Sequence, residues 1–374
     1  MPSFKSFGEV MGSALPTVFE IRLEKEFIVL RGIKSEAANQ LLRGVVVLCL
    51  PVPLKVEDVH LQMTGHLKIS GAFTRKSTHR IDKSIEFFSH NWPSLTGGEP
   101  ISTSKDKFLP PGNYEWPFEL VIDGSMTETI EGLTDTYIKY NLKATVTRGK
   151  LAHDLHAWKP IRIFRTLGEE ALDQAGSVMV EDVWSNKIEY QIGIPRKDVV
   201  FGTVIILEMT LTPLVKGLVV GTIRCDLHEH QEFFPLEGPV DAKSSFQRLR
   251  TVNSWDFELN DGEHSGLEEN GGNGYNLQKV LHLPKQLKEC LQDAEAYGIK
   301  IRHEVKLNIA LHNPDGHISE LRVTLPITIF ISPNMPINAQ GCLVDHAPQS
   351  VQVADRASNP PPLYSQHILD QLYT

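Results

Sequence analysis

The sequence predicts an all-β protein of about two domains, built from packed antiparallel sheets, and three observations carry that prediction. Apolar and polar residues alternate with a period of two in many segments, which is the pattern of half-buried strands. Clusters of Gly, Pro, Asn and Asp separate these segments, whereas helical patterning is scarce. A chain of 374 residues with 41% hydrophobic and 22% charged residues can bury a sizeable core, and its length suits two domains of ordinary size.

Five segments show the alternation most clearly, and each predicts a strand with one buried face. In chain order, these faces consist of Ile138, Tyr140, Leu142, Ala144 and Val146; Ile188, Tyr190, Ile192 and Ile194; Ile205, Leu207, Met209 and Leu211; Val305, Leu307, Ile309 and Leu311; and Leu321, Val323, Leu325, Ile327, Ile329 and Ile331. Pro326 lies inside the last segment and cannot donate to a hydrogen-bond ladder, so a sheet edge or a bulge is predicted there.

Other segments predict shorter or irregular structure. The stretches "EEALDQAG" and "KQLKECLQDAEA" predict short helical turns between strands. Gly, Asn and acidic residues dominate the stretch from Leu259 to Asn276, which predicts a long mobile loop.

The pattern breaks from Gly168 to Asp182, which predicts the boundary between two domains. The first domain is therefore expected at residues 17–167 and the second at residues 183–333. From about Asn334 onward Pro, Gln, Asn, Ala and Ser dominate, and residues 334–374 are expected to form a largely disordered tail.

Composition argues against several classes of function. A net charge of -9 and a pI near 5.9 do not favour unselective nucleic-acid binding, which requires clustered Lys and Arg. The four cysteines lie far apart without a CxxC spacing, so free buried thiols are expected rather than disulfides or a zinc site. The chain shows no signal-peptide pattern and no run of roughly 18 apolar residues, so a soluble, cytoplasmic protein without stable membrane insertion is expected.

The sequence has no strong motif for catalysis or for metal binding. The sequence contains no GxSxG elbow, P-loop or HExxH motif, so no catalytic residue and no cofactor is predicted. Two histidine pairs, His153 with His156 and His228 with His230, would ligate a metal only if further ligands converged on them. Solvated surface imidazoles are the expected interpretation of both pairs.

The C-terminal stretch "ASNPPPLYSQHILDQLYT" contains the strongest short motif. Pro361, Pro362, Leu363 and Tyr364 have the form Pro-Pro-x-Tyr, in which consecutive prolines hold the backbone near polyproline II before binding. Such a segment suits the aromatic groove of a WW domain, where the prolines stack and the Tyr364 ring fills a second pocket. A proline-rich linker with an accidental tyrosine is the alternative.

The residues after this motif carry a weaker signal. Ile368 and Leu369 are spaced to share a helical face with Leu372, which would let the tail pack against the domain that holds the motif. A frayed chain end is an equally good interpretation of the same residues.

Several long segments resemble the arrestin family in the order in which arrestins carry them. In the first half these are "LPPGNYEWPFELVIDGSMTETIEG", "DTYIKYNLKATV" and "KPIRIFRTL", which resemble the signature strands of the amino-terminal arrestin domain. In the second half "NKIEYQIGIPRKDVVFGTVIILEMTLTPLVKGLVVG" and "LHNPDGHISELRVTLPITIFISPN" are similar to the opening and closing strands of the carboxyl domain. The resemblance covers about residues 17 to 335 and is specific to the fungal alpha-arrestins, the CreD-like group of HECT-type ubiquitin ligase-interacting proteins.

This resemblance implies two tandem immunoglobulin-like β-sandwiches followed by a largely disordered tail. It also implies that the protein is a non-catalytic adaptor that brings other proteins together. The PPxY motif would recruit a HECT-type ligase of the Nedd4 family through its WW domains, and another surface would recognise plasma-membrane transporters. The transporter would then be ubiquitinated and internalised, in connection with carbon catabolite control. The adaptor would be cytoplasmic and transiently recruited to the plasma membrane and endosomes.

Two further points bear on the expected adaptor function. Longer relatives carry further PPxY motifs, and two motifs bind a ligase with several WW domains more tightly than the one motif in this sequence would. The alternative function is a retromer-type cargo-sorting protein, which also uses two arrestin-like sandwiches but recruits no ligase.

Overall fold

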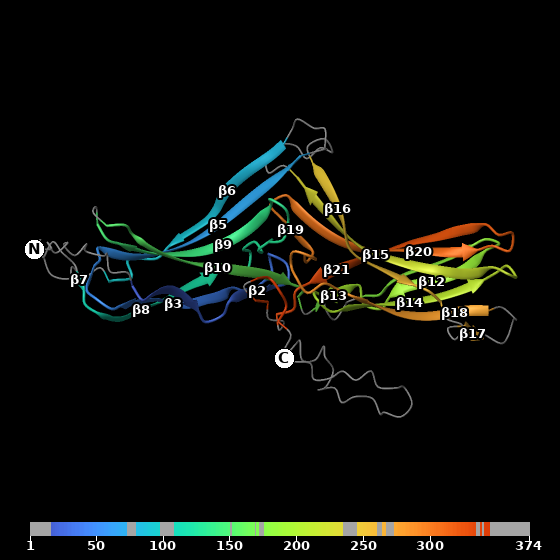
Figure 1. The fold of residues 1–374 in the computed structure, drawn as a ribbon, viewed down its shortest axis with the longest axis horizontal. Helices are drawn as coiled ribbons and strands as arrows, with labels where there is room; N and C mark the ends of the chain where they lie inside the picture. Colours follow the sequence, from blue (N-terminus) through green and yellow to red (C-terminus); the bar gives the residue numbers. More distant parts are fainter. Residues whose placement is uncertain are drawn as a thin grey trace, which may run out of the picture.

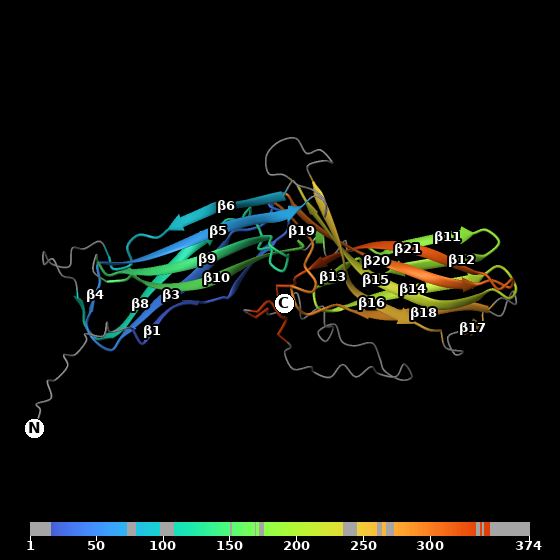
Figure 2. The same cartoon turned by 45° about the horizontal axis from the view of Figure 1, so that its top comes forward.

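Two β-sandwiches lie end to end in a computed structural model of the chain (Figures 1 and 2). The structure describes residues 16–72, 80–97, 108–149, 152–168, 170–171, 176–234, 245–259, 264–266, 273–333, 337–338 and 340–344. The named elements within these residues are all strands, and Glu170 and Ala171, in the stretch "EEALDQAG", are helical. Within the same residues, no helix has both the length and the apolar character needed to cross a bilayer.

The first sandwich packs a three-stranded sheet on a five-stranded sheet (Figure 1). The smaller sheet has the order β1 (Val18–Leu23), β3 (Gln40–Leu50) and β8 (Gly112–Ile122). The larger sheet has the order β2 (Phe27–Arg31), β10 (Leu155–Thr166), β9 (Tyr137–Thr147), β5 (Asp58–Ala72) and β6 (Arg80–Asn91). A separate short pair joins β4 (Leu54–Lys55) to β7 (Phe108–Leu109).

The second sandwich also contains two sheets. One has the order β11 (Val178–Trp184), β12 (Ile188–Ile194), β14 (Val204–Pro213), β18 (Asn273–His282) and β17 (His264–Gly266). The other has the order β13 (Asp198–Val200), β21 (Ile318–Phe330), β20 (Ile299–His312), β15 (Val219–Phe233) and β16 (Phe246–Phe257), with β19 (Ala294–Ala296) paired to β20. β2 pairs with β10 in parallel and β13 pairs with β21 in parallel, whereas the other strand pairs are antiparallel.

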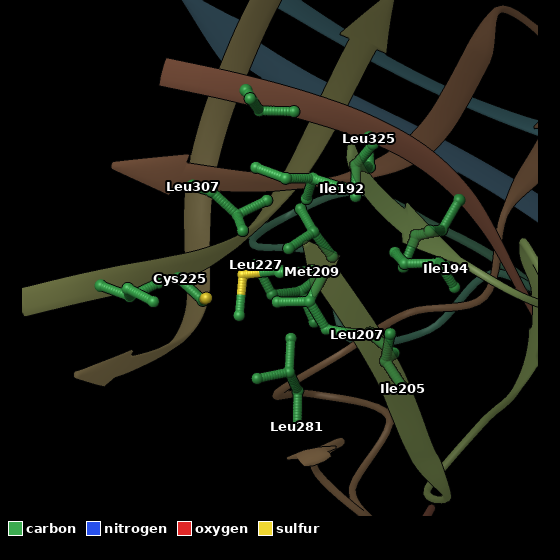
Figure 3. Packing of buried hydrophobic residues seen from close by; sticks show 14 of the residues in the cluster. Ile192, Ile194, Ile205, Leu207, Met209, Cys225, Leu227, Leu281, Leu307 and Leu325 are labelled. Carbon is green, nitrogen blue, oxygen red and sulfur yellow. The ribbon is translucent and has the colours of Figure 1, made fainter. Parts of the chain in front are cut away.

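The predicted buried faces are confirmed in all five segments. The side chains assigned to them lie on β9, β12, β14, β20 and β21 or directly after β21, and each is at most 9% exposed. Their polar neighbours face outward because successive side chains of a strand point to opposite sides. Figure 3 shows how Ile192, Met209 and Leu307 from three of these strands meet in the core of the second sandwich.

The predicted edge position of Pro326 agrees with the sheet order. β21 pairs with β20 along its length, and Pro326 lies opposite Glu304 in that ladder. On its other side β21 pairs only with the three residues of β13, from Thr328 to Phe330. Pro326 therefore lies on a stretch of strand whose outer side has no ladder partner among the described residues.

The two sandwiches share hydrophobic core at their junction. The core cluster of the first sandwich includes Phe233, Phe246 and Leu291 from the second half of the chain. Conversely, Phe164 at the end of β10 belongs to the core cluster of the second sandwich. Because an apolar contact of this kind resists relative motion, we infer that the sandwiches move little against each other.

Glycines permit the close approach at this junction. A Cβ on Gly71 of β5 would lie 2.3 Å from the nearest ring atom of Phe246 on β16. Gly132 has φ of +112°, and a Cβ there would lie 2.6 Å from the carbonyl oxygen of Leu287. Any larger residue at either position would push the sandwiches apart or strain the backbone.

Three segments differ from the sequence-based expectations. In "KQLKECLQDAEA" the expected helical turn is confined to residues 286–290, where the amides of Glu289 and Cys290 both donate to the carbonyl of Gln286, and the rest of the stretch leads into β19. The expected loop from Leu259 to Asn276 contains β17 and the start of β18, because backbone groups can pair at a sheet edge whatever the side chains are. The second sandwich begins with β11 at Val178, earlier than the expected start at residue 183.

The start of the predicted tail is ordered against the junction. Ile337 is 5% exposed and belongs to the core of the second sandwich. The backbone amide of Leu343 donates to the carbonyl of Lys285 at 2.8 Å, and that of Leu287 donates to the carbonyl of Gly341 at 2.9 Å. Residues 337–338 and 340–344 therefore pack on the domains, since an apolar side chain and backbone hydrogen bonds offset the ordering entropy. This part of the chain departs from the expected disorder.

Candidate functional site at the domain junction

An open cleft of about 1610 Å³ lies between the two sandwiches. The first sandwich contributes Glu128 and Arg165 to its wall, and the second contributes Asp293, Arg302 and His303. The wall thus carries charges of both signs from both domains. The connection between β18 and β19, residues 283–293, forms part of this region and is called the junction loop below.

Arg165 organises the side of the cleft that belongs to the first sandwich. It lies near the end of β10 and donates to the carbonyl oxygens of Gly32 at 3.0 Å, Gly124 at 2.9 Å and Met126 at 2.6 Å. Its Nε also lies 3.4 Å from the Glu128 carboxylate, whose side chain is 5% exposed. One guanidinium therefore ties two separate backbone segments, at Gly32 and at residues 124–126, to β10 while it also pairs with Glu128; these four contacts exceed the three N–H groups of an ammonium.

A second polar group lies inside the second sandwich, where Glu229 occupies the inward face of β15. The strand register places Glu229 opposite Arg250 on β16 and His303 on β20. The Arg250 guanidinium donates to both Glu229 carboxylate oxygens, at 2.7 and 2.6 Å. The backbone amide of Leu291 donates to the same carboxylate at 2.9 Å, which fixes the junction loop over the sheet.

His303 connects this carboxylate to a second one. Its Nδ1 lies 2.7 Å from a carboxylate oxygen of Asp293, and its Nε2 lies 3.3 Å from Glu229 and 4.0 Å from the Cys290 sulfur. Asp293 also accepts from the backbone amide of Ile329 at 3.0 Å. Glu229, Arg250, Cys290, Asp293 and His303 are called the junction cluster below.

Burial and charge determine the protonation of this cluster. Burial alone would raise the pKa of Glu229, but hydrogen bonds and charges from His303 and Arg250 outweigh it and lower the pKa to about 2. Burial alone would lower the pKa of His303, but the Asp293 and Glu229 carboxylates outweigh it and hold the pKa well above its usual value. An imidazolium therefore lies between two carboxylates at neutral pH.

The arrangement of the junction cluster suits a role in holding the junction loop on the second sandwich better than a role in catalysis. The Glu229 and His303 side chains are completely buried, and Cys290 is completely buried beside them. A catalytic thiol or base must reach a substrate, whereas these groups reach only one another and the junction loop. The expectation that no residue is catalytic stays a prediction.

The histidine pairs singled out from the sequence do not form a common site in the described residues. His153 and His156 are exposed, as expected for surface imidazoles. His228 and His230 are half-buried instead, and both face Glu304, at 3.9 and 2.8 Å. Burial is the main reason that the pKa of His228 is lowered.

Glu229 was not predicted as a site residue, although both of its neighbours, His228 and His230, were considered as metal ligands. The apolar alternation of β15 runs through Ile223, Cys225 and Leu227 and then continues in phase to Glu229. A carboxylate on the buried face of a strand requires a partner. The alternation along β15 could therefore have identified Glu229 as a buried charge with a partner. In the same way His303 continues in phase with the buried face that begins at Val305.

The residues assigned to WW-domain binding lie outside the described part of the chain. These are Pro361, Pro362, Leu363 and Tyr364, and the same holds for the auxiliary Ile368 and Leu369. Before them in the sequence, the carbonyl of Asn338 accepts from the Arg162 guanidinium at 2.6 Å. Because Arg162 belongs to β10, this bond joins the end of the described chain to the first sandwich.

Two family models match the chain in tandem. Residues 35–162 match "Arrestin (or S-antigen), N-terminal domain", and residues 184–334 match "Arrestin (or S-antigen), C-terminal domain". The first range runs from before β3 into β10, and the second runs from the end of β11 past β21. The two matched ranges therefore correspond to the two sandwiches.

Curated fungal proteins resemble the chain along nearly all of its length. A protein of Aspergillus fumigatus named "Probable HECT-type ubiquitin ligase-interacting protein creD" is 43% identical over 365 residues, which is 95% of this chain and 59% of that protein. The Aspergillus oryzae protein of the same name is 44% identical, with 95% of this chain and 60% of that protein covered. "HECT-type ubiquitin ligase-interacting protein creD" of Emericella nidulans is 41% identical, with 95% of this chain and 60% of that protein covered. The chain thus spans about six tenths of the length of these relatives.

Proposed function

The chain belongs to the arrestin family, and from that premise we propose that it is a non-catalytic adaptor that brings a HECT-type ubiquitin ligase to membrane-protein cargo. The names of its relatives support the ligase half of the proposal, since each is described as interacting with a HECT-type ubiquitin ligase. The relatives extend beyond the matched region, so the ligase contact of this chain has to be argued from its own residues.

The observation that carries the proposal is the motif from Pro361 to Tyr364. Two prolines followed by a variable residue and a tyrosine match the ligands of WW domains, which are the modules that Nedd4-type ligases use for recruitment. The prolines limit the entropy lost on binding because they favour polyproline II in the free chain. Leu363 occupies the variable position and is expected to point away from the groove.

The adaptor acts through proximity in this proposal. The ligase holds its own catalytic cysteine, so the adaptor needs only to keep a cargo lysine within reach of it. The cargo that we propose is a plasma-membrane transporter, which would be internalised after ubiquitination under carbon catabolite control. The adaptor would remain cytoplasmic and visit the plasma membrane and endosomes only while bound to cargo.

The two-domain framework supports such a role. The hydrophobic core that the two sandwiches share joins them, so a cargo bound on either domain would be connected through this junction to residue 344. Nineteen residues lie between residue 344 and Tyr364 in the sequence.

Affinity capture with matched variants tests the proposal. Wild type, Tyr364→Ala and Leu363→Ala would be used as baits in a fungal extract, and captured proteins identified by mass spectrometry. We expect Tyr364→Ala to lose the ligase and keep the transporter, and Leu363→Ala to keep both. Equal ligase capture by wild type and Tyr364→Ala would contradict the proposal. Cargo captured without any ligase by wild type would favour the cargo-sorting alternative.

Calorimetry on a peptide of residues 358–373 tests the contact itself. A single WW domain should bind it with a dissociation constant on the order of micromolar to tens of micromolar, because a short motif buries little area. Tyr364→Ala should cost about 2 kcal/mol, the scale of a buried aromatic anchor. Ile368→Ala combined with Leu369→Ala should weaken binding relative to the wild-type peptide if residues 368–372 pack on the WW domain as a helix. The pair should leave binding unchanged if these residues are a frayed chain end.

A further inference from the structure

Three metal-ligating side chains converge inside the second sandwich. The Cys290 sulfur, a ring nitrogen of His303 and a carboxylate oxygen of Glu229 all lie within 4.8 Å of one another, and all three residues are buried. They come from the junction loop, β20 and β15, so only the fold brings them together. We propose that these three residues bind one Zn²⁺ ion, which the wide spacing of the cysteines in the sequence did not suggest.

The distances between the donor atoms suit a zinc ion. Nitrogen and oxygen ligands at about 2.0–2.1 Å from a tetrahedral ion lie roughly 3.3 Å apart, and nitrogen and sulfur lie roughly 3.6 Å apart. The observed separations from His303 Nε2 are 3.3 Å to Glu229 and 4.0 Å to Cys290. The sulfur needs to approach His303 Nε2 by a few tenths of an ångström, and it lies within 4.8 Å of the Glu229 oxygen. For a direct charge-assisted hydrogen bond, 3.3 Å is long.

The surroundings orient the ligands as in known zinc sites. Asp293 accepts the Nδ1 proton of His303 at 2.7 Å, which leaves Nε2 directed at Glu229 and Cys290. A carboxylate behind a ligating histidine fixes the ring and makes the metal-facing nitrogen more basic. Asp293 is itself held by the backbone amide of Ile329 at 3.0 Å.

The types of ligand favour zinc over Mg²⁺ and Ca²⁺. A thiolate and an imidazole are ligands of zinc and other late transition metals, whereas Mg²⁺ and Ca²⁺ require sets of oxygen ligands. Three protein ligands leave a fourth position at a tetrahedral ion, which a water molecule would occupy. Bound zinc would fasten the junction loop to β15 and β20 where Leu291 packs into the first sandwich.

The test uses the purified full chain stripped of metal with a chelator. Equilibrium dialysis against ZnCl₂ with a competing chelator, read by elemental analysis, should give one zinc per chain. Cys290→Ser should weaken binding by about 100-fold or more, and Asp293→Asn by about 10-fold or more. Cys225→Ser removes a different buried thiol, and His230→Gln removes a half-exposed imidazole. Both controls should bind zinc as wild type does.

One measurement on wild type does not depend on the folding of any variant. Co²⁺ substituted for Zn²⁺ should produce thiolate-to-cobalt charge-transfer absorption. Wild type that binds no zinc in the presence of the competitor would overturn the proposal. So would zinc binding without thiolate absorption, or equal binding by wild type and a folded Cys290→Ser variant.

Discussion

Replacing Arg165 with Ala is expected to destabilise the protein by about 3 to 5 kcal/mol, the usual cost of removing one partner of a buried ion pair. The substitution leaves the Glu128 carboxylate, 5% exposed, without the cation beside it. It also removes the donors to the carbonyls of Gly32, Gly124 and Met126. Arg165 is 13% exposed and lines the open cleft, so water can replace some of these donors, which keeps the expected loss within this range.

The assay is urea unfolding together with calorimetric melting of the full chain. A loss of this size should lower the melting temperature by roughly 10 °C for a domain of this length. Arg322→Ala is the matched control, because Arg322 pairs with Glu320 at the surface and is 75% exposed. It should cost at most about 0.5 kcal/mol.

A double-mutant cycle tests the reason for the loss. Glu128→Gln removes the charge that Arg165→Ala leaves unpaired, so the double variant should be more stable than the sum of the two single losses predicts, by about 1 to 3 kcal/mol. A loss below about 1 kcal/mol for Arg165→Ala, no larger than that of Arg322→Ala, would show that the guanidinium does not organise this side of the cleft.

Three further predictions follow from burial and protonation. Ile327→Asp should destabilise the second sandwich by several kcal/mol, on the order of the cost of a buried unpaired charge, whereas Ile318→Asp on the same strand, at a site 62% exposed, should change the melting temperature little. Burial raises the pKa of the Cys225 thiol to about 12, so native protein at pH 8 should resist alkylation at Cys225 while the half-buried Cys49 reacts, and mass spectrometry of the labelled peptides would reveal the opposite order if the burial were wrong. Burial alone would raise the pKa of Asp58, but hydrogen bonds from two hydroxyls and a backbone amide outweigh it and lower the pKa. The stability that Asp58 contributes is therefore fully present above its unfolded pKa of about 4 and lost as pH falls through the lower folded value. Asp58→Asn should thus be less stable than wild type at pH 7 and converge with it in acid, and a difference that does not depend on pH would contradict the assignment.

Sequence alone was sufficient for the strands and their buried faces. The faces of β9, β12, β14, β20 and β21 were predicted residue by residue because side-chain direction in a strand alternates locally, whatever the strand pairs with. The family resemblance was sufficient for the two tandem sandwiches, and the family models confirm it. The motif from Pro361 to Tyr364 is likewise a local feature, and its role stays a prediction.

Only the tertiary structure revealed the junction. Glu229 and His303 are 74 residues apart, and the register of β15 against β20 decides that they meet. The same holds for Arg162 and Asn338, which are 176 residues apart in the sequence and 2.6 Å apart in the fold. Local patterns could show that Glu229 faces inward but not which charge neutralises it. Pairing between distant segments depends on the packing of the whole chain, and this packing made a buried ionic cluster from residues that are unremarkable when read one segment at a time.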